Sequence, residues 1–158
     1  METFRGMRRK EKETGREEAF EILENADYLT LAVMLENSYP FSVPLNHILM
    51  NGKIYFHSAM EGQKTDAFKL NNRVCVSAVE RYAVVPDKFY VNYRSVVAFG
   101  TISPVEDKKE KLDALSGIIN RFSPGFEESG KAYIEKRFEH TAVYCIEIEH
   151  ISGKKSRK

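Results

Sequence analysis

Residues 39–64 read Tyr-Pro-Phe-Ser-Val-Pro-Leu-Asn-His-Ile-Leu-Met-Asn-Gly-Lys-Ile-Tyr-Phe-His-Ser-Ala-Met-Glu-Gly-Gln-Lys. In the first part of this stretch Val43 and Leu45 alternate with polar or proline residues, and residues 54–57 show the same alternation. A period of two is typical of half-buried β-strands. Asn51-Gly52 tolerates the positive φ angles of a type I′ turn, so the sequence predicts that the two runs pair as an antiparallel hairpin.

The segment that follows this hairpin carries polar side chains suited to an anion. His57, Ser58 and Lys64 supply donors, and Gly62 lies between them. A glycine lets a ligand approach the backbone closely, and a helix predicted to begin near Lys64 adds amide N–H groups at its first turn. The sequence therefore predicts a phosphate site at this point of the chain.

Length and composition limit the class of protein. The 158 residues are 42% hydrophobic and 11% aromatic, which predicts one domain over 1–158 with a sizeable core and flexible ends at about 1–13 and 153–158. The formal net charge is +1, so no overall field favours nucleic acid or an anionic membrane surface. Basic residues do gather near both termini. They are either solvated chain ends, or a terminal lysine among them reaches a bound phosphate. These basic residues are Arg8, Arg9, Lys10, Lys12, Lys154, Lys155, Arg157 and Lys158.

The two cysteines, Cys75 and Cys145, lie in strand-like runs and form no Cys-x-x-Cys or Cys/His cluster. This pattern predicts buried, reduced thiols. No stretch has the character of a signal peptide or of a membrane span. The sequence therefore predicts a cytoplasmic protein without a membrane partner.

Further elements follow from the hydrophobic periodicity along the chain. Thr14-Gly15-Arg16-Glu17 reads as a capping box that starts a helix ending near Asn25. The other predicted helices cover 64–70, 107–122 and 127–138, and the other predicted strands cover 28–35, 73–82, 90–102 and 141–151, with a surface loop over 83–89. Six strands in mostly hairpin order favour an antiparallel barrel with appended helices over a doubly wound parallel sheet.

Several common catalytic motifs are absent from the sequence. It contains no P-loop, no Gly-x-Gly-x-x-Gly turn, no His-Glu-x-x-His helix and no Gly-x-Ser-x-Gly elbow. The four histidines are scattered and have no acidic or cysteine neighbours at ligand spacing, so we expect no metal site.

The combination of motifs resembles the flavin-binding core of the pyridoxamine 5′-phosphate oxidase-like split-barrel proteins. Within that superfamily the sequence is most similar to the branch of NimA-like nitroimidazole-resistance proteins, and the resemblance spans roughly residues 7 to 155. The matching motifs are Tyr39-Pro40, Ser42-Val43-Pro44-Leu45-Asn46, Gly52-Lys53-Ile54-Tyr55-Phe56-His57-Ser58-Ala59, Glu61-Gly62, Lys64, Tyr93-Arg94-Ser95-Val96-Val97, Gly100 and Ile151-Ser152-Gly153-Lys154-Lys155.

The resemblance implies a mainly β fold with appended helices, a six-stranded antiparallel split β-barrel of the FMN-binding type. It also implies a homodimer that holds each FMN in a groove between protomers. The implied contacts are Val43, Pro44 and Asn46 beside the isoalloxazine ring, His57, Ser58 and Lys64 around the phosphate, and Arg94 and Ser95 as further donors.

The function implied is an FMN-dependent oxidoreductase that takes electrons from a reduced nicotinamide or another donor and passes them to a small organic acceptor, such as a nitroaromatic or nitroimidazole. The chain lacks an arginine-rich motif for a substrate phosphate, so oxidation of the vitamin B6 phosphates is not supported. His57 is a candidate catalytic proton donor or simply a hydrogen-bond partner of the cofactor. The alternative is a carrier that binds FMN or haem without turnover, with His47 or His57 as the axial ligand of haem.

Overall fold

The computed structural model describes residues 4–156, so Arg157 and Lys158 of the C-terminal basic cluster lie outside the described residues. The helices are α1 (Arg16–Asn25), α2 (Gln63–Leu70), α3 (Lys108–Phe122) and α4 (Glu127–Arg137), with short 3₁₀ turns at Lys10–Lys12, Pro86–Lys88 and Phe138–His140. The strands are β1 (Leu29–Met34), β2 (Pro40–Leu45), β3 (Ile48–Met50), β4 (Lys53–Ser58), β5 (Arg73–Val85), β6 (Tyr90–Pro104) and β7 (Ala142–Lys155). Lys154 and Lys155 thus belong to the last strand.

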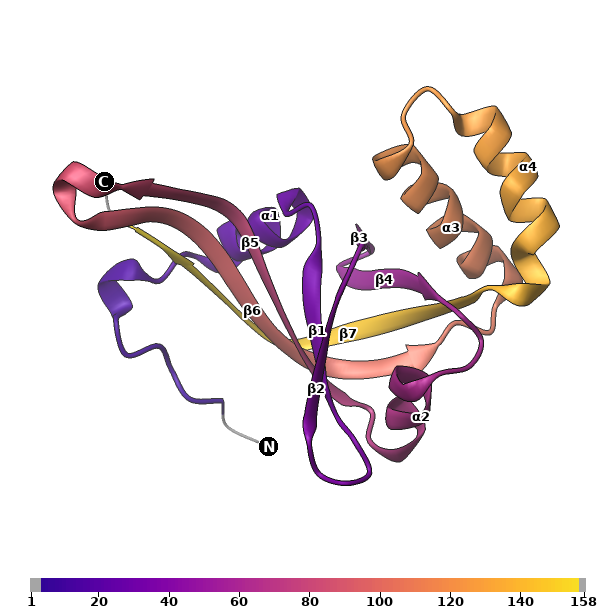
Figure 1. The fold of residues 1–158 in the computed structure, drawn as a ribbon, viewed down its shortest axis with the longest axis horizontal. Coiled ribbons are helices and arrows are strands. Elements are labelled where there is room, and N and C mark those ends of the chain that lie inside the picture. Colours follow the sequence, from indigo (N-terminus) through magenta and orange to yellow (C-terminus); the bar gives the residue numbers. More distant parts are fainter. Residues whose placement is uncertain (1–3, 157–158) are drawn as a thin grey trace.

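The strands form one curled antiparallel sheet in the order β2-β1-β5-β6-β7-β4-β3 (Figure 1). The two edge strands, β2 and β3, are not paired with each other, so the barrel stays open. The predicted mainly β split barrel with appended helices is confirmed. The described sheet has seven strands rather than six because the three residues Ile48–Met50 form a strand of their own.

The predicted pairing of the two runs in residues 39–64 is wrong. Strand β2 pairs with β1, with Val43 opposite Leu31, and does not pair with β4. The run is interrupted because the Asn46 side chain donates to the Asp27 carbonyl oxygen at 3.1 Å and the His47 ring is buried beside the Leu23 carbonyl oxygen. The chain therefore leaves β2 at residue 46 and crosses to the opposite edge of the sheet.

The predicted Asn51-Gly52 turn does form, and it joins β3 to β4. The φ angles of Asn51 and Gly52 are 54° and 74°, which is the left-handed geometry that a type I′ turn requires. Met50 and Lys53 pair directly on either side of the turn. The turn chemistry was sufficient to predict the hairpin but not the length of its first strand.

The predicted loop over 83–89 is a continuation of strands β5 and β6. Ala83 pairs with Asn92, and the chain reverses through a single 3₁₀ turn followed by Phe89 at φ 52°. The resulting two-stranded ribbon, residues 79–95, extends away from the barrel at the left of Figure 1. We call it the β5–β6 arm.

The first helix forms where predicted, but its capping box does not. Gly15 is the N-cap of α1, and the Thr14 hydroxyl donates to the Gly15 carbonyl oxygen at 3.1 Å. Thr14 is displaced from the cap because its own amide donates to the Gly153 carbonyl oxygen of β7 at 3.0 Å. Helix α3 does have a side-chain cap, since the Asp107 side chain accepts from the amide of Glu110 at 2.8 Å.

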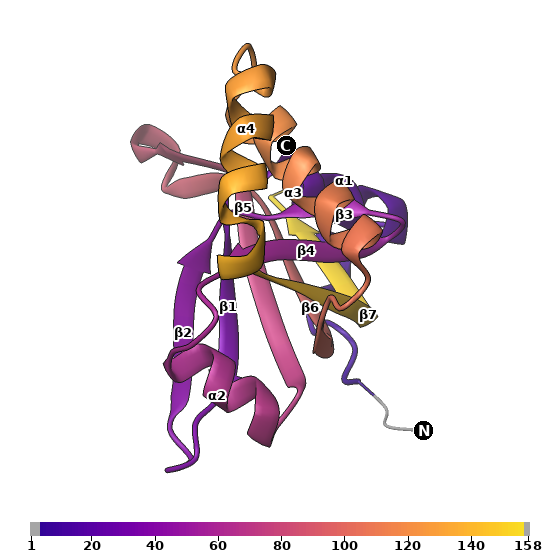
Figure 2. The same ribbon diagram turned by 90° about the vertical axis from the view of Figure 1, so that its right-hand side faces the viewer.

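Two hydrophobic clusters hold these elements together. The larger fills the barrel between the sheet, α1 and the inner face of α2, and the smaller lies between α3, α4 and the outer face of β3, β4 and β7. Figure 2 shows α3 and α4 on one side of β4 and α2 beside β1 and β2 on the other. Within residues 4–156, no helix is both long and apolar enough to cross a bilayer. The end of β4 thus lies between two helical layers.

Candidate functional site

A cavity forms where the open barrel brings β2 close to the end of β4. Its volume is about 210 Å³, and its walls are Phe41 and Val43 of β2, Ser58 and Ala59 at the end of β4, and residues 61–64 at the start of α2. Four strands separate β2 from β4 in the sheet, so only the curl of the sheet brings them together. The cavity unites Val43, Ser58 and Lys64, three of the predicted ligand contacts.

The polar groups of this cavity have few partners in the protein. Ser58 is 7% exposed, and its Oγ atom is buried without a hydrogen-bond partner. Lys64 is half-buried and, among the ion pairs of residues 4–156, it has none, although the exposed carboxylate of Glu61 also lines the cavity. A buried hydroxyl without a partner costs about 1–3 kcal/mol, and an anion would satisfy both groups.

The start of α2 contributes backbone donors to the same cavity. Gly62 is the N-cap at φ 145°, a conformation that side chains other than glycine rarely adopt, and no side chain caps the helix. The Thr65 hydroxyl donates to the Gly62 carbonyl oxygen at 2.7 Å and fixes this turn. The free N–H groups of the first turn and the helix dipole therefore favour an anion beside Lys64.

His57, on β4, does not line this cavity, but the charge of Lys64 acts on its imidazole. Partial desolvation, followed by the positive charge of Lys64, lowers the pKa of His57 below its usual value of 6.5. The imidazole is therefore neutral at pH 7 in the free protein. A bound phosphate would counteract the charge of Lys64 and raise this pKa again.

The predicted ring contacts lie along the edge of the sheet. Val43 is half-buried, Pro44 is exposed, and Asn46 follows the last residue of β2. Because β2 is an edge strand, its outward backbone groups have no partner strand, and a proline is tolerated there. This edge can offer hydrogen bonds to the rim of a flat ring system.

Arg94 and Ser95 lie at the other end of the molecule. The Arg94 guanidinium pairs with Glu80 at 2.6 Å and with Glu18 at 3.3 Å, and Ser95 Oγ donates to the Lys154 carbonyl oxygen at 3.5 Å. Glu18 also accepts from Lys155 Nζ at 2.8 Å, and the contacts with Lys155 and then Arg94 lower its pKa. These donors thus already have partners within the protein.

One chain does not bring its two groups of predicted site residues together. Ser58 pairs with Ala142 at one end of β7, whereas Arg94 pairs with Lys155 at the other end. At about 3.3 Å per residue, these two ends are about 40 Å apart along the strand. Within one chain, Arg94 and Ser95 therefore do not contribute to the Ser58 cavity.

A second cavity adjoins the first on the side of α3 and α4. Its volume is about 330 Å³, and it shares Ser58 and Ala59 with the anion cavity. The other walls are His57, the inner faces of α3 and α4, and the turn that leads to β7. Sequence patterns did not predict this cavity. The hydrophobic periodicity of α3 and α4 predicts which side of each helix is buried, but it does not predict which strand that side covers.

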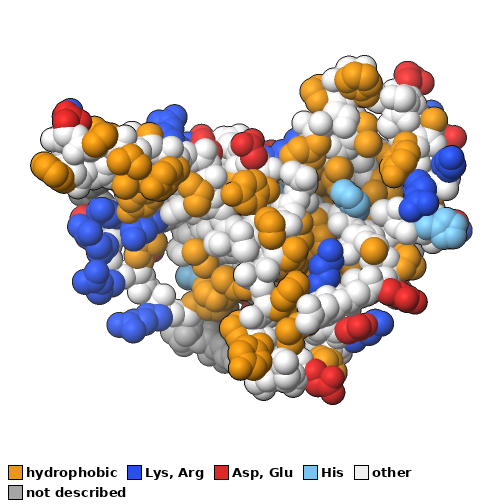
Figure 3. Space-filling view, in the orientation of Figure 1, with side chains coloured by type: hydrophobic (Ala, Val, Ile, Leu, Met, Phe, Trp, Pro, Cys, Tyr) orange, Lys and Arg blue, Asp and Glu red, His pale blue; other side chains and the backbone are white. Residues whose placement is uncertain are grey.

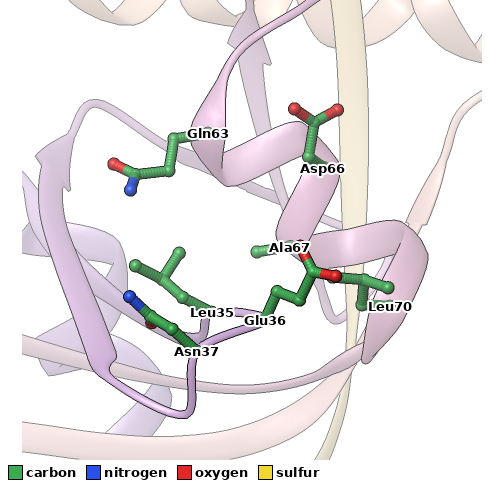
Figure 4. A pocket seen from close by; sticks show the side chains of 7 residues that line it. All are labelled: Leu35, Glu36, Asn37, Gln63, Asp66, Ala67 and Leu70. Carbon is green, nitrogen blue, oxygen red and sulfur yellow. The ribbon is translucent and has the colours of Figure 1, made fainter.

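A third cavity, of about 390 Å³, lies between the β1–β2 turn and the outer side of α2 (Figure 4). Glu36 and Asp66 are among its walls, and the side chains that line it include no lysine or arginine. Two carboxylates without a neighbouring cation repel a phosphate. The cavity at Ser58 and Lys64 is therefore the better anion site.

The fold and this cavity together define a split-barrel protein with a corner suited to an anion, between an edge strand and a helix N-terminus. The family model described as pyridoxamine 5′-phosphate oxidase matches residues 15–155. The chain belongs to this family, which confirms the resemblance recognised in the sequence. A comparison with curated protein sequences finds no match.

Solved structures share the fold at low sequence identity. A proposed 5-nitroimidazole antibiotic resistance protein from Bacteroides thetaiotaomicron is 22% identical, with a TM-score of 0.72 over 89% of this chain and 83% of that one. The flavocytochrome Anf3 from Azotobacter vinelandii is also 22% identical, with a TM-score of 0.81 over 97% and 73% of the two chains. The FAD and heme binding protein from Mycobacterium smegmatis is 21% identical, with a TM-score of 0.79 over 93% and 74%.

Proposed function

We propose that the protein binds FMN and is an oxidoreductase that passes electrons from a reduced nicotinamide to a small organic acceptor, such as a nitroaromatic or nitroimidazole. The observation that carries this proposal is the buried, unpartnered Ser58 Oγ in a cavity that also holds Lys64 and the uncapped start of α2. Support also comes from the family and from similar structures named for flavin, heme or nitroimidazole resistance. The free cysteines Cys75 and Cys145 suit the cytoplasm, where we place the protein.

The residues present fit the parts of FMN. Lys64, Ser58 and the first amides of α2 take the phosphate, because a dianion needs charge-assisted donors. Val43, Pro44 and Asn46 follow the edge along which the ring system would lie. When bound, FMN supplies the electron-transfer chemistry, while the protein positions it and shapes the acceptor site.

His57 gives the test that separates binding from catalysis. We expect purified protein incubated with FMN to keep flavin absorbance after desalting and to oxidise NADPH with a nitroimidazole or quinone acceptor. His57→Ala should weaken FMN binding several-fold, by about 1 kcal/mol for one lost hydrogen bond. The FMN-loaded variant should keep its rate within a few-fold.

Three outcomes would change this proposal. Protein that stays colourless after incubation with FMN contradicts the flavin site. Retained flavin with no NADPH oxidation supports the carrier alternative. Unchanged FMN affinity in His57→Ala together with a large loss of rate makes His57 a catalytic proton donor.

We also propose a homodimer that completes the site. Val79, Tyr82, Val84 and Phe89 on the β5–β6 arm are 54%, 69%, 57% and 96% exposed, which is unusual for apolar side chains on one element. Figure 3 shows hydrophobic side chains gathered over this arm, at the left. A second copy seated there would cover the arm and bring its own Ser58 cavity near Arg94.

Replacement of Phe89 by aspartate should weaken this dimer. Burial of an aromatic ring contributes about 1.5–3 kcal/mol, so we expect the dissociation constant to rise at least tenfold, as measured by light scattering across a dilution series. The matched control is Phe126→Asp, the same change at a 68% exposed phenylalanine before α4. A wild-type protein that is monomeric at every concentration contradicts the dimer.

Haem binding is the second candidate function, and the structure favours one of the two candidate axial histidines. The His47 ring is fully buried and bonded to the Leu23 carbonyl oxygen, so it is not available as an axial ligand. His57 is exposed and lines the 330 Å³ cavity. An absorption spectrum after incubation with each cofactor distinguishes flavin from haem directly.

A further inference from the structure

We infer that the cavity between the end of β4 and helices α3 and α4 holds the adenylate half of FAD, so that the protein prefers FAD to free FMN. This inference rests on the proposed function, because it takes the flavin phosphate to lie at Ser58 and Lys64. The two cavities share Ser58 and Ala59, so the second adjoins the proposed phosphate position.

The size of the second cavity suits a nucleotide. Its volume of about 330 Å³ lies at the lower end of the range of small-molecule pockets, about 300–1,000 Å³. The anion cavity, at about 210 Å³, is smaller than that range. The two cavities share the wall formed by Ser58 and Ala59, which adjoins the proposed phosphate position.

The walls of the second cavity match the two parts of an adenylate. Leu115, Ile118 and Ile134 form an apolar surface against which a flat base can lie, and Tyr133, which is 63% exposed, adds an aromatic ring. Arg137 lies in the same wall, and the ion pairs of residues 4–156 include none for its guanidinium. A guanidinium binds a phosphate through two parallel hydrogen bonds, so Arg137 suits the second phosphate of a dinucleotide.

The position of this cavity argues against a separate electron acceptor as its occupant. The edge proposed for the flavin ring follows Val43, Pro44 and Asn46, none of which lines the second cavity. An acceptor must contact the ring, whereas a molecule in the second cavity would contact the phosphate end. This position instead suits a group that is covalently joined to that phosphate.

The test is a comparison of two flavins in three proteins. Dissociation constants for FMN and FAD are measured by fluorescence titration with wild type, Arg137→Gln and Lys136→Gln. Lys136 is the neighbouring exposed cation on α4 and does not line the cavity, so it controls for the loss of one positive charge. Thermal melting of each variant checks that it is folded.

We expect wild type to bind FAD at least tenfold more tightly than FMN. Arg137→Gln should lose most of that preference, with FMN affinity unchanged, and Lys136→Gln should behave as wild type. Equal affinity of wild type for the two flavins overturns the inference, as does an equal loss for both flavins in Arg137→Gln. Failure to bind either flavin instead contradicts the proposed function, so the two failures are distinguishable.

Discussion

Replacement of Lys64 by alanine is expected to weaken FMN binding by about 1.5–3 kcal/mol, which is roughly ten- to hundredfold in the dissociation constant. The reason is that Lys64 is half-buried and lines the same cavity as the unpartnered Ser58 hydroxyl, where, among residues 4–156, it provides the only ammonium group. A charge-assisted hydrogen bond to a phosphate is stronger than one between neutral groups. Isothermal titration calorimetry at fixed ionic strength measures the change.

Two controls separate the phosphate contact from a general effect on the protein. Riboflavin lacks the phosphate, so its affinity should be the same in wild type and in Lys64→Ala. Lys69→Ala removes an equal charge from the last turn of α2, where the lysine is exposed and lies 3.6 Å from Asp66. If Lys64→Ala binds FMN as wild type does, Lys64 is only a solvated residue of the first turn.

A loss of stability at mildly acidic pH is the second large effect expected, and it originates at His47. The ring is fully buried, and its Nε2 donates to the Leu23 carbonyl oxygen at 2.7 Å, which leaves Nδ1 buried without a partner. Desolvation, with a smaller contribution from the charge of Arg121, lowers the pKa of His47 from 6.5 to about 4. The folded protein therefore holds this histidine neutral.

The sign of the pH effect follows from proton uptake. Between pH 6.5 and about 4 the unfolded chain binds a proton at His47 that the folded chain does not, so the free energy of unfolding decreases as the pH falls through this window. The full loss is about 3.5 kcal/mol, at about 1.4 kcal/mol per pH unit over this window. That is a large part of the total stability of a typical domain, about 5–15 kcal/mol.

Urea unfolding at a series of pH values measures this effect, with His47→Gln as the comparison. Glutamine can donate to the Leu23 carbonyl oxygen but does not titrate. Other groups, including His57 with its own lowered pKa, are common to both proteins and cancel in the difference. We expect the stability of wild type to fall more steeply than that of the variant below pH 6.5, whereas parallel curves would show that His47 does not titrate differently on folding.

Local chemistry made most of the fold predictable. The period of two gave the central strands, and Asn51-Gly52 gave a tight turn with the observed φ angles. The pairing of β2 was not predictable, because it depends on what Asn46 and His47 contact. Those contacts, the Asp27 and Leu23 carbonyl oxygens, lie about twenty residues earlier in the chain.

The candidate site was predictable only where it is continuous in sequence. Ser58 and Lys64 stand six residues apart and share a cavity, as the sequence predicted. Sequence patterns alone could not show that Arg94 lies far from this cavity, because that distance is set by the length of β7. The cavity beside α3 and α4 was missed for the converse reason, since two helices far along the chain pack beside the end of β4.

The open barrel has a consequence for the lifetime of the protein. The anion cavity takes one wall from β2, at one margin of the sheet, and the other from β4 and α2, near the opposite margin. A bound molecule would tie these margins together, and its binding free energy would add to the free energy of unfolding. Cells starved of riboflavin would then carry more unliganded chains, and proteases would remove these faster than the loaded form.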